Sequence, residues 1–169
     1  MSVTISAATV DGYRQLEPNH LSAPRNGQVY AQLPAKSTIN TLEQGTFVKY
    51  DYANGEVNFT GDGEWFLVFN EEKLYDERKQ MHKDFALKKS DFYDGIMTPR
   101  VFAIKPGDIF TTNNVADGTY TVGNYLKVGE TGILEADSAT GEGVTHQFKV
   151  VKETTMPDGQ AAVKVQVIG

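Results

Sequence analysis

The segment that most constrains the fold is residues 64–79, where a run of large apolar side chains changes directly into a run of charged ones. Trp65 to Phe69 place bulky groups on both faces of a strand, which predicts a central strand buried on two sides. Asn70 is a favourable helix N-cap, and the two glutamates that follow it suit the positive end of a helix dipole. The segment therefore predicts a buried strand followed by a short helix.

The predicted helix runs from about residue 71 to residue 85. Leu74, Met81 and Phe85 recur at helical spacing and would lie on one face against the sheet. The remaining positions are mostly charged, and the simplest interpretation is a face exposed to solvent. A polar docking surface for another protein is the alternative.

The stretch before this strand predicts a β-hairpin. Alternating apolar and polar residues in 47–52 and 56–59 flank Asn54-Gly55, and Asn-Gly is the strongest short signal for a type I′ turn. Together with the buried strand, these runs predict a three-stranded meander within residues 43–95.

Residues 96–169 consist of short apolar runs separated by turn residues at intervals typical of a β-sandwich or small barrel. The last hairpin is the clearest, because Pro157-Asp158-Gly159 leads into the alternating strand that holds Val163, Val165 and Val167. The turn-rich stretch at Asp94-Gly95 marks the boundary between residues 43–95 and 96–169, and the sequence leaves open whether the two parts share one core.

Residues 1–42 have a different character, because prolines, asparagines and a glycine interrupt every apolar run and favour extended backbone. We interpret them as an extended arm with one or two short strands. The arm either packs over its own domain or crosses onto a neighbouring molecule. In the second case its anchors belong partly to the types that interfaces favour, tyrosine and arginine. The candidate interface residues are Tyr13, Arg14, Leu16, Leu21, Arg25 and Tyr30.

The expected fold class is therefore mainly β: an antiparallel sandwich or small barrels, with one short amphipathic helix and an extended N-terminal arm. The chain has no cysteine, which removes disulfides, thiolate metal sites and cysteine nucleophiles. Its net charge of −6 is spread along the sequence without a basic stripe, so we expect no nucleic-acid partner. The start of the sequence makes a poor signal peptide, and no apolar run reaches the roughly 20 residues that span a bilayer, so we expect no membrane partner.

The sequence contains none of the common catalytic patterns, so we expect no enzyme, no cofactor and no metal. There is no Gly-x-Ser-x-Gly elbow, phosphate-binding Gly-Lys-Ser/Thr loop or EF-hand spacing. His20, His82 and His146 are far apart in the sequence, and His146 lies on an apolar strand face where a core histidine is the simpler interpretation. A pair of carboxylates for glycoside hydrolysis stays open, because their separation is a tertiary property.

Residues 64–79, 94–102 and 105–113 resemble stretches of the small virion proteins of tailed bacteriophages, the capsid auxiliary or head decoration proteins. This resemblance implies a β-rich structural protein that binds the outer surface of an assembled lattice of major capsid protein. Such proteins bind in many copies, often as trimers or other homo-oligomers, and frequently bridge capsomers through an extended arm. The implied location is the virion surface, after synthesis in the host cytoplasm.

A different class of function fits the same composition. A small β-domain of a fibre or adhesin binds a carbohydrate or another receptor, and Trp65 or exposed tyrosines would stack on the sugar. Because Trp65 alternates within an apolar strand, packing in the core is the competing interpretation for its side chain.

Overall fold

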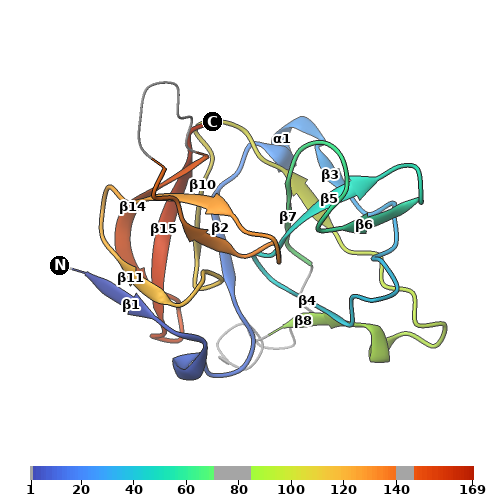
Figure 1. Ribbon diagram of the computed structural model, residues 1–169, viewed down its shortest axis with the longest axis horizontal. Coiled ribbons are helices and arrows are strands. Elements are labelled where there is room, and N and C mark those ends of the chain that lie inside the picture. The colour runs from blue at the N-terminus through green and yellow to red at the C-terminus, as the bar shows by residue number, and fades with distance from the viewer. Residues whose placement is uncertain (1, 71–84, 140–146) are drawn as a thin grey trace.

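The computed structural model describes residues 2–70, 85–139 and 147–169, and these form antiparallel β-sheets with very little helix (Figure 1). The predicted mainly β class is confirmed. Two larger open sheets face each other, and two pairs of short strands flank them. The helix predicted over residues 71–85 lies outside the described residues except for Phe85, as do His82 and His146. No helix among the described residues is long and apolar enough to cross a membrane.

The larger sheet has six strands, in the order β13-β12-β14-β15-β10-β2. Their bounds are β2 (Leu16–His20), β10 (Ile109–Thr112), β12 (Tyr125–Val128), β13 (Leu134–Ala136), β14 (Phe148–Thr155) and β15 (Ala161–Val167). The hairpin of β14 and β15 forms as predicted, and Gly159 takes the positive φ of 90° that its turn needs. The three alternating valines of β15 are all buried, so this hairpin supplies much of one core wall.

The second sheet has five strands, in the order β3-β9-β7-β5-β6. Their bounds are β3 (Val29–Tyr30), β5 (Phe47–Asp51), β6 (Glu56–Asn58), β7 (Phe66–Val68) and β9 (Val101–Ala103). Strand β7 lies in the middle, and its three residues are at most 7% exposed. The prediction of a central strand buried on both faces is therefore confirmed.

Two details of the predicted meander are wrong. Strand β5 lies between β6 and β7, so β7 pairs with β5 and not with its sequence neighbour β6. The hairpin loop has four residues and not two, because Asp51 pairs with Glu56. Only Gly55 has positive φ there, since the Asp51 carboxylate accepts hydrogen bonds from Asn54 N and Nδ2 at 3.1 and 2.8 Å and holds a wider turn.

The remaining elements are short. Strands β1 (Val3–Ile5) and β11 (Gly118–Tyr120) pair beside the six-stranded sheet, and β4 (Thr41–Glu43) pairs with β8 (Ala86–Lys88) below the five-stranded one. The helical turns are α1 (Ala23–Asn26), η1 (Ala7–Thr9) and η3 (Lys89–Asp91).

The five-stranded sheet separates two cores. Successive side chains of β5, β7 and β9 point to opposite faces, as strand geometry requires. Phe47, Leu67 and Phe102 enter the first core, which fills the space between the two large sheets. Their neighbours enter the second core on the other face: Val48, Tyr50, Phe66, Val68, Val101 and Ala103. The first core includes residues from all three predicted segments of the chain.

The arm, residues 1–42, lies over the sheets of its own chain. Strand β2 extends the six-stranded sheet by pairing with β10, and β3 extends the five-stranded sheet by pairing with β9. Of the two interpretations of the arm, packing over its own domain is the one that this fold displays (Figure 1).

Candidate functional site

Three of the six predicted interface residues are buried within the fold. Leu16 and Leu21 are 4% and 6% exposed and belong to the first core. Arg14 is 8% exposed, and its Nη1 donates to the carbonyl oxygen of Asn113 at 2.6 Å. These side chains therefore stabilise the fold and offer no surface to a partner.

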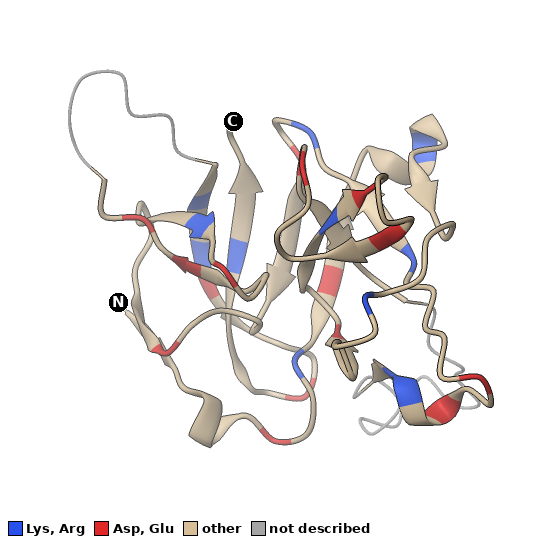
Figure 2. Ribbon diagram, turned by 45° about the vertical axis from the view of Figure 1, so that its right-hand side comes forward, with Lys and Arg blue, Asp and Glu red and all other residues tan. Residues whose placement is uncertain are grey.

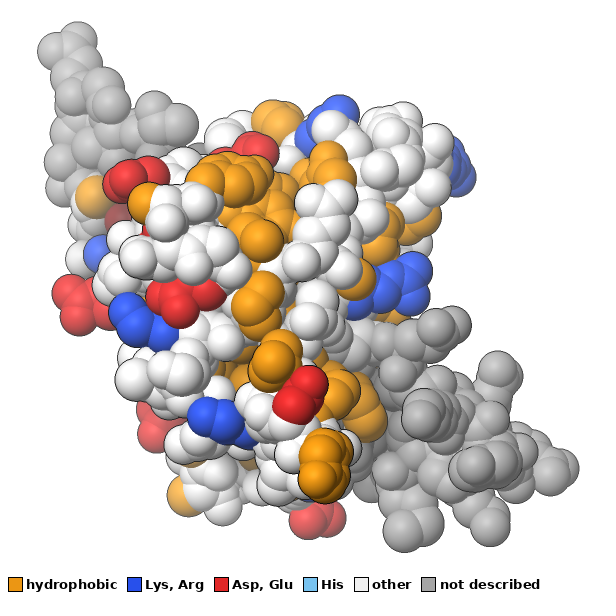
Figure 3. Space-filling view, turned by 90° about the vertical axis from the view of Figure 1, so that its right-hand side faces the viewer, with side chains coloured by type: hydrophobic (Ala, Val, Ile, Leu, Met, Phe, Trp, Pro, Cys, Tyr) orange, Lys and Arg blue, Asp and Glu red, His pale blue; other side chains and the backbone are white. Residues whose placement is uncertain are grey.

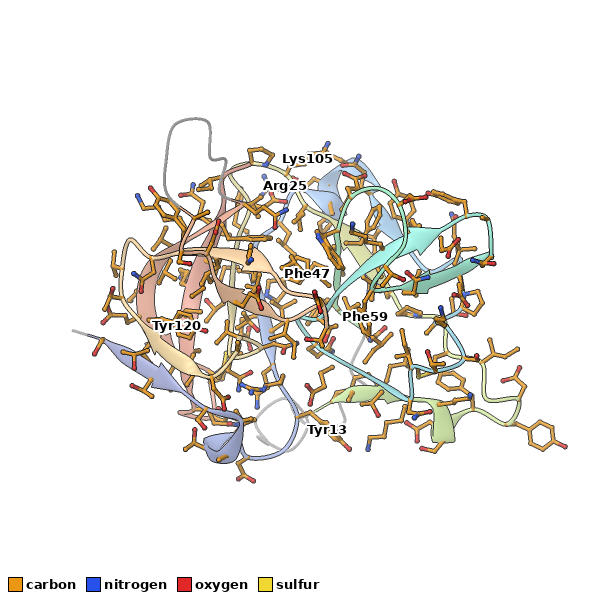
Figure 4. The ribbon with its side chains drawn as sticks, viewed as in Figure 1. Tyr13, Arg25, Phe47, Phe59, Lys105 and Tyr120 are labelled. Atoms are coloured by element: carbon orange, nitrogen blue, oxygen red, sulfur yellow. The ribbon has the colours of Figure 1, made fainter. Side chains whose placement is uncertain are left out.

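The other three lie at different places. Tyr13 is half-buried beneath the Nζ of Lys88, 4.5 Å from its ring centroid, whereas Arg25 is exposed on α1 at the opposite end of the molecule (Figure 4). Tyr30 is half-buried at the end of β3. The six residues thus do not form one surface.

A seam of buried amides, not foreseen from the sequence, joins the arm and the two sheets. Gln44 and Asn70 exchange two hydrogen bonds of 2.8 Å, and the Asn70 side-chain oxygen accepts from Arg100 N. Asn114 Nδ2 donates to the Gln44 carbonyl, and Asn113 Oδ1 accepts from the backbone of residue 15. The Asn70 side-chain oxygen thus binds the backbone of Arg100, the residue that precedes β9. The predicted role of Asn70 as a helix N-cap concerns residues outside the described ranges and stays a prediction.

The seam ends at a carboxylate near the surface. Asp158 accepts hydrogen bonds from Gln15 Nε2 at 2.5 Å and from Gln160 N at 3.0 Å. Partial burial opposes ionisation of this carboxyl, but the hydrogen bonds outweigh it and lower the pKa of Asp158. This carboxylate ties the arm to the β14–β15 turn.

No group of three or more potential metal ligands occurs in the described parts of the chain. Acidic and basic residues are scattered over both sheets, without a concentrated field of either sign (Figure 2). The surfaces that remain as candidates are therefore ones shaped by aromatic side chains.

The first of these is a cluster of aromatic rings in tilted and edge-to-face contact on the second core. Tyr50 lies 4.7 Å from Phe66 and 5.5 Å from Tyr52 between ring centroids, and Tyr30 lies 6.4 Å from Tyr50. Tyr50 is almost fully buried, whereas Tyr52 is 78% exposed. The cluster therefore runs from the core out to the surface.

Burial raises the pKa of Tyr50 to about 12, and Tyr52 and Tyr30 add to this effect. Its hydroxyl group has no hydrogen-bond partner within the described residues. Tyr50 thus acts as a buried support for Tyr52.

Neighbouring segments continue this surface. The backbone of residues 34–36 bonds to Val57 of β6 on one side and to the Met97 carbonyl on the other, which brings the segment 92–97 alongside. That segment exposes Ile96 at 53% and the whole ring of Tyr93. Figure 3 shows a band of hydrophobic side chains across this end of the molecule, with isolated charged groups beside it.

We call this surface the aromatic face. Its exposed and half-buried members are Tyr30, Leu33, Tyr52, Tyr93 and Ile96. Of the six arm residues, only Tyr30 belongs to it. The positions of Tyr50 and Tyr52, two apart in an alternating strand, were a usable sequence signal, whereas the approach of residues 92–97 depends on pairings distant in the sequence.

A second surface surrounds Trp65. This side chain is half-buried, packs on the edge of the first core and lies 4.7 Å beneath the Nζ of Lys49. It lines a hollow of about 430 Å³ together with Lys49, Glu64 and Gln147. The Trp65 side chain thus packs against the first core and also lines the hollow.

Comparison with known proteins finds no matching family model, no significantly similar curated protein and no significantly similar solved structure.

Proposed function

We propose that this chain is a structural, non-enzymatic protein that binds the outer surface of an assembled phage capsid and stabilises or decorates it. The observation that carries the proposal is the aromatic face, an exposed surface rich in tyrosine. Contiguous apolar surface on a folded domain marks an interaction site, and tyrosine is among the residues that dominate binding energies. The choice of a capsid as partner rests on the resemblance of residues 64–79, 94–102 and 105–113 to decoration proteins.

The aromatic face and the resemblance meet in one segment. The stretch 94–102 supplies Ile96, which is exposed on this face, and Met97, which anchors the segment in the second core. We place the binding on a folded surface and not on an arm that crosses onto a neighbouring molecule, because removing residues 1–42 would delete β2 and four buried residues of the first core. On the capsid, copies of this chain would associate as trimers or another homo-oligomer, which is what the resemblance implies.

The test begins by asking whether a major capsid gene lies beside the gene for this chain. It then measures cosedimentation of the chain with capsids assembled from that capsid protein alone. Tyr52→Ser combined with Tyr93→Ser should weaken binding about tenfold or more, because these are the two most exposed rings of the aromatic face and tyrosines carry much of the energy of an interface. Tyr125→Ser, which removes a tyrosine from β12 in the six-stranded sheet, is the matched control and should bind as the unmodified chain does.

Unfolding midpoints within a few degrees of the unmodified chain would show that the double variant is folded. Equal binding by the double variant and the control would refute the role of the aromatic face. A gene neighbourhood without capsid genes, together with no capsid binding by the unmodified chain, would refute the capsid as partner.

The hollow at Trp65 supports a second candidate, a module that binds carbohydrate. An aromatic edge beside an ammonium, a carboxylate and an amide is the kind of lining that holds a sugar. A glycan-array signal that Trp65→Ala abolishes, in a variant that remains folded, would favour this function. No signal from the unmodified chain would refute it.

A further inference from the structure

A separate hollow of about 310 Å³ lies between β2, α1 and the start of β9. Three side chains that can carry positive charge line it from three different elements: His20, Arg25 and Arg100. Aromatic rings, Phe69 and Phe102, form part of the same lining. No aspartate or glutamate lines this hollow, although the chain as a whole carries a net charge of −6.

The two guanidinium groups are available for a ligand. Across the described ranges 2–70, 85–139 and 147–169, neither Arg25 nor Arg100 forms an ion pair. The Asp108 carboxylate, which contacts Ser22 just before α1, is 3% exposed and already accepts hydrogen bonds from Ser22 N, Ser22 Oγ and Lys105 N. It is therefore engaged in holding the loops beneath the hollow.

Arg100 is held in place before any ligand arrives. Its Cζ lies 5.3 Å from the centroid of the Phe102 ring, and Phe69 lies 5.8 Å from the same ring. Its backbone N donates to Asn70 Oδ1 at 2.8 Å, and its carbonyl accepts from Phe69 N at 3.1 Å. A guanidinium supported against a ring loses little freedom on binding and can bond a carboxylate with two parallel N–H groups.

We propose that this hollow binds an acidic peptide segment of a protein partner. Arg25 and Arg100 hold a carboxylate, and the rings of Phe69 and Phe102 contact an apolar side chain next to it. The volume accommodates a few side chains of a peptide, at the lower end of the usual range for ligand pockets. The net charge of −6 on the chain disfavours a long polyanion such as nucleic acid, because the charges that extend beyond the hollow would meet net repulsion.

This assignment is independent of the aromatic face and of the capsid. Arg25 lies beside Lys105 at the top of the molecule in Figure 4, whereas the β5–β6 hairpin, whose loop contains Tyr52, lies at the right of the molecule in Figure 1. Loss of capsid binding and loss of peptide binding would therefore be separate results.

The experiment measures fluorescence anisotropy of a labelled peptide, Asp-Phe-Glu-Leu-Asp, titrated with the full chain. A matched peptide, Asn-Phe-Gln-Leu-Asn, has the same shape without the carboxylates. We expect the acidic peptide to bind about tenfold more tightly than the amide peptide, and to weaken as salt is raised.

Two sets of variants locate the site. Arg25→Gln combined with Arg100→Gln should reduce the affinity for the acidic peptide to that for the amide peptide. Arg100→Lys should lose part of the affinity, because it keeps the charge but not the paired donors. Lys127→Gln combined with Lys152→Gln removes two charges from the six-stranded sheet and should change binding less than about twofold.

Several results would overturn the proposal. One is equal binding of the acidic and amide peptides by the unmodified chain. Another is an equal loss in the arginine and lysine double variants, which would indicate general electrostatic attraction. A third is displacement of the labelled peptide by inorganic sulfate at a lower concentration than by unlabelled peptide, which would indicate a site for small anions. Displacement by a short single-stranded oligonucleotide at such a concentration would indicate a site for nucleic acid.

Discussion

The two cores on either face of the five-stranded sheet differ in how they are covered. The first is closed between two large sheets and consists of aliphatic side chains with the rings of Phe47, Phe110 and Phe148 in mutual contact. The second is covered by the short β4–β8 pair and by loops, and its rings continue outward to Tyr52. Alternate side chains of β5, β7 and β9 thus contribute to both cores. The first core lies between two sheets, and the aromatic rings of the second continue to the surface.

This difference separates stability from binding within one small domain. A core between two hydrogen-bonded sheets has little freedom to rearrange, so it should hold most of the folding free energy. A core covered by loops can leave aromatic groups exposed without losing the fold, which is where the proposed binding surface lies. Two of the four experiments below compare the two cores directly, and the other two test a single contact and a single buried group.

The largest expected effect comes from shortening one leucine on each side. Leu67→Ala, in β7 and fully buried in the first core, should lower the free energy of unfolding by about 4–5 kcal/mol, since the two sheets cannot close the cavity. Leu42→Ala, 1% exposed in β4 of the second core, should cost about 2–3 kcal/mol, because short strands and loops can relax. Urea unfolding measures both, and a larger loss for Leu42→Ala would contradict the comparison.

Two glycines test the contact between the six-stranded sheet and β5. Gly132 has φ of 76°, its carbonyl accepts from Phe47 N at 2.7 Å, and an added Cβ would collide with the Phe47 carbonyl and the Phe59 ring. Gly132→Ala should therefore cost about 3 kcal/mol or more.

The matched control for that variant is Gly123→Ala. Gly123 has φ of 97° and open space around an added Cβ, so only the backbone strain of about 1 kcal/mol remains. Equal losses of stability for the two variants in thermal or urea unfolding would contradict this. They would show that the close contact between Gly132 and β5 adds nothing to the cost of backbone strain.

Removing one hydroxyl group on each side should have opposite consequences. Tyr120, 3% exposed in the first core, donates its hydroxyl to the Ala116 carbonyl at 2.7 Å, so Tyr120→Phe should lose about 1 kcal/mol. The Tyr50 hydroxyl is buried without a partner in the described structure, so Tyr50→Phe should be neutral or slightly stabilising. A loss for Tyr50→Phe as large as that for Tyr120→Phe would indicate a hydrogen bond to bound water.

The smallest effect is a dependence on alkaline pH. Burial raises the pKa of Tyr50 in the folded chain to about 12, above its ordinary value of 10.0. Below pH 10 both states keep the proton, and above it the unfolded chain loses the proton first, so stability falls as pH rises towards 12. The loss should be on the order of 1 kcal/mol as the pH passes about 10.5.

Tyr50→Phe should remove that part of the pH dependence in urea unfolding, whereas Tyr93→Phe, on the fully exposed ring, is the control. A steeper alkaline loss in Tyr50→Phe than in the unmodified chain would contradict the assignment of this pKa to burial of Tyr50.

The strands that were predicted well are those whose pattern is decided by neighbours in the sequence. Three large residues at 66–68 identified the central strand because a run without polar positions needs cover on both faces. The β14–β15 hairpin followed from alternating valines and a Pro-Asp-Gly turn. The loop at Asn54-Gly55 differed because the Asp51 side chain formed local bonds that the strand pattern does not encode.

The candidate surfaces were harder to predict, because they depend on contacts between residues that are distant in the sequence. Leu16 and Leu21 were selected as apolar residues in a proline-rich stretch. Both are buried in the first core, because β2 pairs with β10, about 90 positions further along the chain. Arg25 and Arg100 are 75 positions apart and line one hollow only because α1 packs beside β9. No local pattern records such an approach.

The sequence by itself determined an antiparallel β-protein, because alternation and turn chemistry act over a few residues and fix which groups face inward. The tertiary structure decided that the arm joins both sheets, that β5 separates β6 from β7, and that one sheet serves two cores. Those outcomes depend on pairings between residues up to 96 positions apart, as for Leu16 and Thr112. Their free energies come from burial that exists only once the sheets have met.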